Sequence, residues 1–237
     1  TVEWEDALWI AKFPARGDTL NIPRIEFATM ELARRCGITV PELRRVQIGE
    51  NDIFLSRRFD RVRGRQGWLR LGFLSSLSFM QWDERDRLRW DYPGMANAMR
   101  RHMKATDIEE LYRRMVFNML VRNTDDHPRN HGFLVDGEKM FFSPAYDIVP
   151  TPARFGVGTR FRLAMSVGER GREAALENAL SRSANFGLSK AHARIIVQQL
   201  LETVSGWREH FEECGVSGRQ VDFLAPSFAL CDRHRRK

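Results

Sequence analysis

The segment Asn123–His131 concentrates residues whose types and spacing could do chemistry. It contains the pattern Asp-x-x-x-x-Asn from Asp125 to Asn130, and another carboxylate follows at Asp147. Phosphoryl transfer needs a carboxylate that accepts the proton of the acceptor hydroxyl, and oxygen ligands that hold magnesium against the phosphates. One aspartate and one asparagine suffice for the metal, because magnesium prefers oxygen ligands and keeps several waters. Taken alone, the pattern favours a capped polar turn.

Two earlier residues change this balance. Lys12 lies near the end of the apolar run Trp9–Pro14, where it could point into a cleft and pair with nucleotide phosphates. Glu26, early on the next expected helix, could fix the lysine by an ion pair, as kinases do. The simpler interpretations are an outward-facing strand lysine and a first-turn acid favoured by the helix dipole. Lysine, glutamate, the Asp–Asn pattern and the late aspartate follow the order found in kinases, which favours the catalytic interpretation.

The first part of the chain is expected to form strands around one helix. The apolar run Ala7–Phe13 predicts a strand that Pro14 ends. Pro23 in the first turn and Gly37 as a stop predict a helix with Ile25–Cys36 as its body. A strand pair is expected next, with its turn at residues 49–52; its two strands are Glu42–Ile48 and Ile53–Phe59.

The second part is expected to be mainly helical. The capping box Thr106–Glu109 predicts a helix that reaches about Arg122 and is apolar on nearly every side near its end. Strands at Gly132–Val135 and Lys139–Phe142 are expected to form a hairpin through Asp136-Gly137.

A long amphipathic helix is expected from about Ser189, with apolar residues at Ile196, Leu200, Val204 and Phe211. This succession predicts an α+β, two-lobed, protein-kinase-like fold with a nucleotide cleft at the junction. A small β-rich N-lobe with one helix would span residues 1–62, and a larger, mostly helical C-lobe would span residues 63–237.

Composition sets wider limits. The 237 residues are 43% hydrophobic, enough for one large domain or two packed lobes. No apolar stretch is long enough to span a membrane, and the three scattered cysteines suggest neither a disulfide framework nor a zinc motif, so we expect a cytoplasmic protein. The net charge of +7 could favour an anionic partner, although scattered arginines are more typical of a solvated surface.

Several segments now resemble a known family, the HipA-like serine/threonine kinases, which are toxins of bacterial type II toxin–antitoxin systems. The resemblance runs from about Ala7 to about Leu201, and Thr124–Asn130 is its most specific part. The segments that resemble this family in order and residue type are Trp9–Pro14, Glu26–Val40, Arg58–Arg61, Asn123–Asn130 and Tyr146–Pro150.

The resemblance implies a role for each matching residue. Lys12 would contact the ATP phosphates with Glu26 as its partner, and Asp125 would be the catalytic base. Asn130 and Asp147 would hold Mg²⁺. The remaining expected contacts concern the nucleotide: residues Arg57 to Phe59 at the adenine, Asp60 near the ribose, and His127 as a conformational or phosphate-side residue of the catalytic loop.

The resemblance also implies cofactors and partners. These are ATP and Mg²⁺, a protein substrate such as an aminoacyl-tRNA synthetase, and a helix-turn-helix antitoxin similar to HipB, through which the kinase meets DNA. The glycine-rich phosphate loop of the family would lie upstream of Thr1. Asp147 stands in Tyr-Asp-Ile-Val rather than Asp-Phe-Gly, which fits this family and excludes eukaryotic kinases.

Other interpretations stay open at this point. A kinase fold without catalysis could regulate DNA or a partner through its basic surface, and a small-molecule phosphotransferase would also need an Asp–Asn loop and a later aspartate. Asp125, His127 and His131 could instead hold zinc, since two histidines four residues apart suit a helical metal site. Pro128 between the histidines argues against that helix.

Overall fold

The computed structural model describes residues 1–153 and 160–235. Its first part is an antiparallel sheet with the strand order β1-β2-β4-β3. The strands are β1 (Val2–Trp4), β2 (Ala7–Lys12), β3 (Leu43–Ile48) and β4 (Asn51–Arg57). The expected strands are therefore present, but the turn between β3 and β4 is shorter than predicted. Asn51 pairs with Ile48, so only Gly49 and Glu50 remain in the turn.

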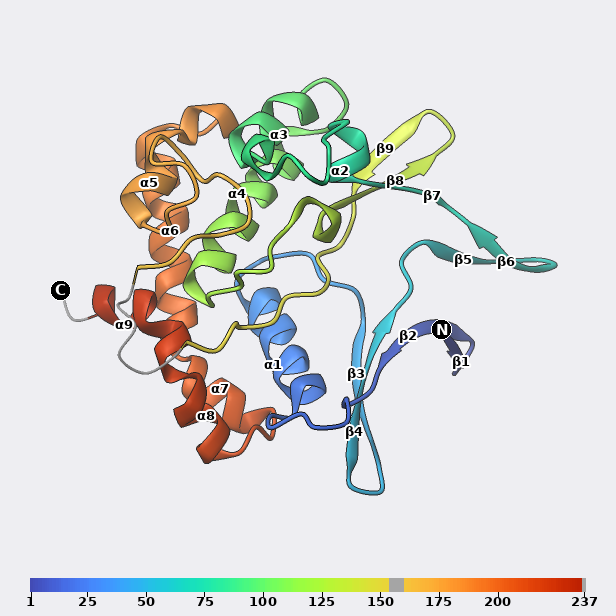
Figure 1. The fold of residues 1–237 in the computed structure, drawn as a ribbon. Helices are drawn as coiled ribbons and strands as arrows, with labels where there is room; N and C mark the ends of the chain where they lie inside the picture. The colour runs from blue at the N-terminus through green and yellow to red at the C-terminus, as the bar shows by residue number, and fades with distance from the viewer. Residues whose placement is uncertain (154–159, 236–237) are drawn as a thin grey trace.

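Helix α1 (Ile22–Arg35) packs between this sheet and the helices of the second part (Figure 1). The backbone N–H of Arg24 donates to the side chain of Asn21 at 3.1 Å, which caps the first turn, and Pro23 follows the cap. Gly37 has φ +74°, the left-handed conformation that ends helices. The helix predicted from Pro23 and Gly37 is confirmed.

Two β elements were not expected from the sequence. Strands β5 (Arg61–Gly64) and β6 (Gly67–Arg70) form a two-stranded ribbon that projects from the molecule in Figure 1. Strand β7 (Gly72–Ser75) pairs with β8 and so adds a third strand to the predicted hairpin. The lobe boundary predicted between residues 62 and 63 falls within β5 and stays a prediction.

The hairpin itself is β8 (Gly132–Asp136) and β9 (Lys139–Phe142). Asp136 pairs with Lys139, so the turn is Gly137-Glu138, one residue later than predicted. The glycine explains the shift, because Gly137 has φ +59° and a two-residue hairpin loop favours a residue with positive φ there.

The buried helix before the candidate catalytic segment is α4 (Ala105–Leu120). Thr106 does not cap it, contrary to prediction. The backbone N–H of Lys104 instead donates to Asp107 Oδ2 at 3.1 Å, so the helix begins earlier and Thr106 is already helical. Residues Met115–Leu120 are fully or nearly fully buried, as expected.

The predicted long C-terminal helix is two helices, α6 (Lys190–Ser205) and α7 (Trp207–Glu213), separated at Gly206. Phe211 belongs to α7, so the single-helix prediction was wrong there. The apolar residues keep a helical spacing across the break at Gly206 because both helices cover one core. In this core, Trp207 stacks on Phe228 with ring centroids 3.9 Å apart.

The remaining helical elements are α2 (Ser76–Phe79), η1 (Arg87–Arg89), α3 (Tyr92–Met99), η2 (Pro128–Asn130), α5 (Leu176–Ser181), η3 (Ser183–Phe186), α8 (Gly218–Leu224), η4 (Ala225–Phe228) and α9 (Ala229–Arg235). Several of them pack around α4 and α6, whereas α2 and η2 contact β7, and α8 contacts α7 (Figure 1). The α+β architecture with a small β-rich part and a larger helical part is the predicted fold class. No helix within the described residues is long and apolar enough to cross a membrane.

Candidate active site

A cavity of about 330 Å³ opens between the first sheet, helix α1 and the segment that follows β9. Its lining brings together residues that lie far apart in the sequence. Six residues singled out from the sequence line it: Lys12, Glu26, Arg57, Phe59, Asp60 and Asp147. Asp125, His127 and Asn130 are not part of its lining; they lie in the loop after α4.

Lys12 joins two carboxylates across this cavity. Its Nζ donates to Glu26 Oε1 at 2.7 Å and makes a second, very close contact with Asp147 Oδ1. The side chain of Glu26 is only 2% exposed, whereas that of Asp147 is 44% exposed. Strand β2, helix α1 and the segment after β9 therefore meet at a single cation.

Burial and charge act against each other in this group. Burial lowers the pKa of the Lys12 ammonium, but Glu26 and Asp147 together raise it above its ordinary value. Burial raises the pKa of Glu26 to about 7, and the charge of Lys12 only partly opposes that rise. Lys12 thus stays charged, while Glu26 is the carboxylate that burial makes costly to ionise.

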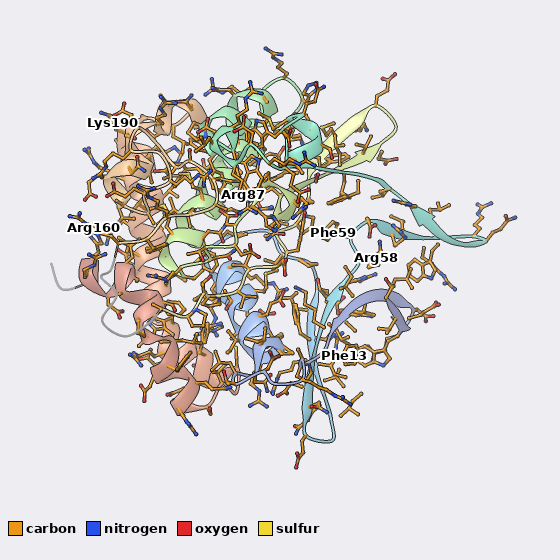
Figure 2. The ribbon with its side chains drawn as sticks, in the orientation of Figure 1. Phe13, Arg58, Phe59, Arg87, Arg160 and Lys190 are labelled. Atoms are coloured by element: carbon orange, nitrogen blue, oxygen red, sulfur yellow. The ribbon has the colours of Figure 1, made fainter. Side chains whose placement is uncertain are left out.

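The connection after β4 forms one wall of the cavity. Figure 2 shows Phe59 on the side of the sheet that faces the helical part, with Arg58 beside it. Arg58 Nη2 contacts Asp60 Oδ2 at 2.6 Å, and Arg61 contacts the same carboxylate. Burial alone would raise the pKa of Asp60, but these arginines lower it below its ordinary value. Arg57 pairs outside this group, with Glu42 at 3.1 Å.

Aromatic rings line the same cavity, and sequence reasoning did not single out their arrangement. The ring centroid of Tyr146 lies 5.9 Å from that of Phe59 and 6.3 Å from that of Phe73. A Cβ at Gly132 would collide with the Phe73 ring, so glycine lets this ring approach β8. Tyr146 directly precedes Asp147, so its position in the sequence could have indicated that it lies near the site. Nothing near Phe73 in the sequence indicates that it lines the cavity.

The loop after α4 holds Asp125 and Asn130 close to the Asp147 segment. Asn130 Nδ2 donates to the Asp125 carbonyl at 3.0 Å, and Tyr146 Oη donates to the Arg129 carbonyl at 2.6 Å. The carboxylate of Asp125 is exposed. Arg129 and Tyr146, which directly precede Asn130 and Asp147 in the sequence, are thus hydrogen-bonded to each other.

Beneath this loop lies a buried polar network that sequence reasoning missed. Asp126 accepts a bond from the Tyr92 hydroxyl and lies 2.7 Å from His131 Nε2. Asn118 Nδ2 donates to the Tyr92 oxygen at 3.3 Å, and Asn123 Nδ2 donates to Asn118 Oδ1 at 3.2 Å. Each of these side chains is buried, so the network fixes the floor of the loop.

A second contact holds the start of the loop. Thr124 Oγ1 donates to Thr151 Oγ1 at 2.8 Å, and the backbone N–H of Thr151 donates to the Arg122 carbonyl at 3.0 Å. His127 is half-buried, and its Nδ1 is buried without a hydrogen-bond partner in the described part of the chain. The structure thus places His127 in the loop but outside the cavity.

The donor set fits magnesium better than zinc. The bond from Asn130 Nδ2 leaves its Oδ1 as a free oxygen ligand, and the Asp147 carboxylate is accessible. His131 Nε2 is engaged by buried Asp126, so only its Nδ1 would remain for a metal, and that atom is buried. Across residues 1–153 and 160–235, no three His, Cys, Asp or Glu side chains gather as a metal site.

The element order and this cleft define a two-lobed, kinase-like fold. The chain belongs to the HipA-like C-terminal domain family, whose model matches residues 1–207. The resemblance stated from the sequence motifs is therefore confirmed.

Individual relatives agree with this family. The Sinorhizobium fredii protein Y4dM, which bears the name of a kinase, is 28% identical over 156 residues, and Y4mE from the same organism, also named as a kinase, is 27% identical over 131 residues. These matches cover 60% and 53% of the chain. The chain spans only about a third of the length of these relatives, 37% and 31% respectively.

Two solved structures share the fold. HipA of Shewanella oneidensis, solved with HipB and operator DNA, matches with a TM-score of 0.70 at 19% identity, covering 95% of this chain and 58% of its own. The Helicobacter pylori proinflammatory kinase CtkA matches with a TM-score of 0.55 at 13% identity, covering 98% of this chain and 93% of its own.

Proposed function

We propose that this chain is the catalytic core of an ATP- and Mg²⁺-dependent kinase that phosphorylates a serine or threonine hydroxyl of a protein substrate. The observation that carries the proposal is the convergence of Glu26 and Asp147 on Lys12 within the cavity. Kinases use this combination to hold nucleotide phosphates and metal. Membership of the HipA-like family supports the same reaction.

The proposed roles follow from the places of the side chains. Lys12, held by Glu26, contacts the ATP phosphates. The adenine packs at Phe59, while backbone groups of residues 57–59 bind its edge and Asp60 lies near the ribose. Because the Asp60 carboxylate is already shared by Arg58 and Arg61, its contribution to binding is mainly to shape that wall.

Asp125 is proposed as the base, because its exposed carboxylate can reach an incoming hydroxyl and accept its proton. Asn130 Oδ1 and the Asp147 carboxylate hold Mg²⁺, which when bound neutralises the charge of the phosphates. His127 is proposed to keep the loop between Asp125 and Asn130 in shape.

The partners are proposed from the family and from one structural neighbour. Because HipA of Shewanella oneidensis is solved with HipB and operator DNA, we propose that the protein containing this chain binds a helix-turn-helix antitoxin and, through it, DNA. The proposed acceptor of the phosphoryl group is a protein, as it is for the serine/threonine kinases that the chain resembles.

Calorimetric titration with ATP, with and without Mg²⁺, tests the proposal. Asp147→Asn should abolish the magnesium-dependent part of binding, whereas Asp136→Asn, an exposed aspartate in the β8–β9 hairpin, should leave it unchanged. Asp125→Asn should still bind ATP but transfer phosphate to dephosphorylated casein about 10²- to 10⁴-fold more slowly. If neither the wild type nor the control binds ATP, the proposal is wrong and a regulatory module is the better interpretation. Transfer to a sugar or aminoglycoside, but not to casein, would instead indicate a small-molecule phosphotransferase.

A further inference from the structure

Three arginines from two distant segments meet on the surface beside the catalytic loop. Arg87 belongs to η1, whereas Arg162 and Arg172 lie on two stretches joined by a β-bridge between Arg162 and Glu173. The Arg172 guanidinium donates to the Arg87 carbonyl, which ties the segments together. We call these three residues and exposed Leu88 the arginine surface.

The charges of this surface are not balanced from within the protein. Burial lowers the pKa of the Arg172 guanidinium, and the like charges of Arg87 and Arg162 lower it further. None of the three pairs with a carboxylate in residues 1–153 and 160–235. An anion bound here would relieve this repulsion.

Neighbouring carboxylates are already engaged elsewhere. Asp86 lies 3.8 Å from Arg89, and Glu173 lies 3.4 Å from Arg170. Glu84 pairs with Arg129 of the catalytic loop. The acids closest in sequence are therefore used to fix other arginines.

Both segments of the surface are tied to the buried network under the loop that carries Asp125. The Tyr92 hydroxyl bonds to Asp126, and the Tyr92 backbone N–H donates to the Ser166 carbonyl at 3.0 Å. The Ser166 N–H donates in turn to the Trp90 carbonyl at 2.8 Å. Glu84, near Arg87 in the sequence, pairs with Arg129 of the same loop, so a segment bound at the arginine surface would lie near this loop.

Leu88 indicates which class of anionic partner fits. Its side chain is 85% exposed, between two arginines. The Arg87 guanidinium lies 5.5 Å from the centre of the Trp90 ring, which restricts its motion. An apolar side chain exposed between two arginines is typical of a protein interface, whereas nucleic-acid backbones are bound by polar and cationic groups.

We infer that the arginine surface docks an acidic segment of the protein acceptor, with an apolar residue of that segment packed on Leu88. The inference rests on the proposed kinase function, because it names the kind of acceptor that reaches Asp125. Arg172 is half-buried and bonded to the backbone, so substitutions at Arg87, Arg162 and Leu88 test it more cleanly.

Fluorescence anisotropy with a labelled peptide of alternating glutamate and leucine around one serine provides the test. The double variant Arg87→Gln/Arg162→Gln should weaken binding by roughly five- to tenfold, because two exposed charge contacts are lost. Leu88→Ser should weaken it by roughly threefold. Matched exposed residues on the β5–β6 ribbon, changed as Arg65→Gln and Leu69→Ser, should leave binding unchanged.

Three results would overturn the inference: no binding of the peptide, equal losses in the ribbon controls, or a labelled DNA duplex that binds more tightly and is weakened by the same variants. ATP titration of the same samples separates the two proposals. Normal magnesium-dependent ATP binding without peptide binding rejects only the arginine surface. Peptide binding without ATP binding rejects the kinase proposal and leaves an acidic-peptide site.

Discussion

Nε2 of His131 lies 2.7 Å from Oδ1 of Asp126, and both side chains are almost fully buried under the loop that carries Asp125. Asp126 directly follows the candidate base, so its buried contacts anchor the backbone next to Asp125. The second oxygen of Asp126 accepts the bond from the Tyr92 hydroxyl. A buried hydrogen-bonded network of this kind favours one loop conformation over others.

Removing the Tyr92 hydroxyl should therefore destabilise the protein. Tyr92→Phe should lower the free energy of unfolding by about 1 to 3 kcal/mol, because Asp126 Oδ2 would be buried without its donor. Urea denaturation measures this change. Tyr112→Phe is the control: that tyrosine is equally buried, but its hydroxyl makes only a 3.4 Å bond to the Ala179 carbonyl, so its loss should be smaller. Equal losses in both variants would contradict a special role for the network.

The glycine at position 132 should control the aromatic wall of the cavity. Gly132→Ala should displace the Phe73 ring, weaken ATP binding, and lower the free energy of unfolding by about 1 to 3 kcal/mol through overpacking. In a Phe73→Ala background the same change should cost little, which a double-mutant cycle detects. Gly218→Ala, where a Cβ meets no neighbour, is the control. Additive effects of the two substitutions would show that Phe73 does not transmit the change.

Local signals predicted much of the fold. The Asn21 to Gly37 segment carries its own cap, first-turn proline and glycine stop, so its helix could be predicted from the sequence. The break at Gly206 could not, because apolar periodicity reports which face is buried and not whether one helix or two bury it. The pairing of β7 with β8 joins residues about sixty positions apart, which no local pattern encodes.

The site divides in the same way. Lys12, Glu26 and Asp147 could be proposed from their order along the chain, and the structure brings them into contact. Tyr92 could not be linked to Asp126, because the contact forms only when α3 packs beside the loop after α4. The arginine surface could not be predicted for the same reason. Its residues come from separate segments and meet only in the folded chain.

Glu26 should make stability depend on pH. Its pKa is about 7 in the folded protein and 4.5 ordinarily, so between these values the folded state binds a proton that the unfolded state lacks. The contribution of Glu26 to the free energy of unfolding is therefore largest below pH 4.5, falls as pH rises through this window, and is constant above about pH 7. Lys12 stays protonated throughout. Urea denaturation of wild type and Glu26→Gln across this range should show the variant gaining relative stability as pH rises, and parallel curves would refute the shifted pKa.

Lys12 and Glu26 should separate stability from nucleotide binding. Lys12→Ala should lower the free energy of unfolding by about 3 kcal/mol well above neutral pH, because it leaves a buried carboxylate without its cation. The double variant Lys12→Ala/Glu26→Gln should recover most of that loss, since no buried charge remains. Neither variant should bind ATP as the wild type does, because the amine proposed to contact the phosphates is absent in both. Urea denaturation and calorimetry measure the two quantities, with Lys139→Ala on exposed β9 as the control. Wild-type ATP affinity in the double variant would show that Lys12 serves the fold alone.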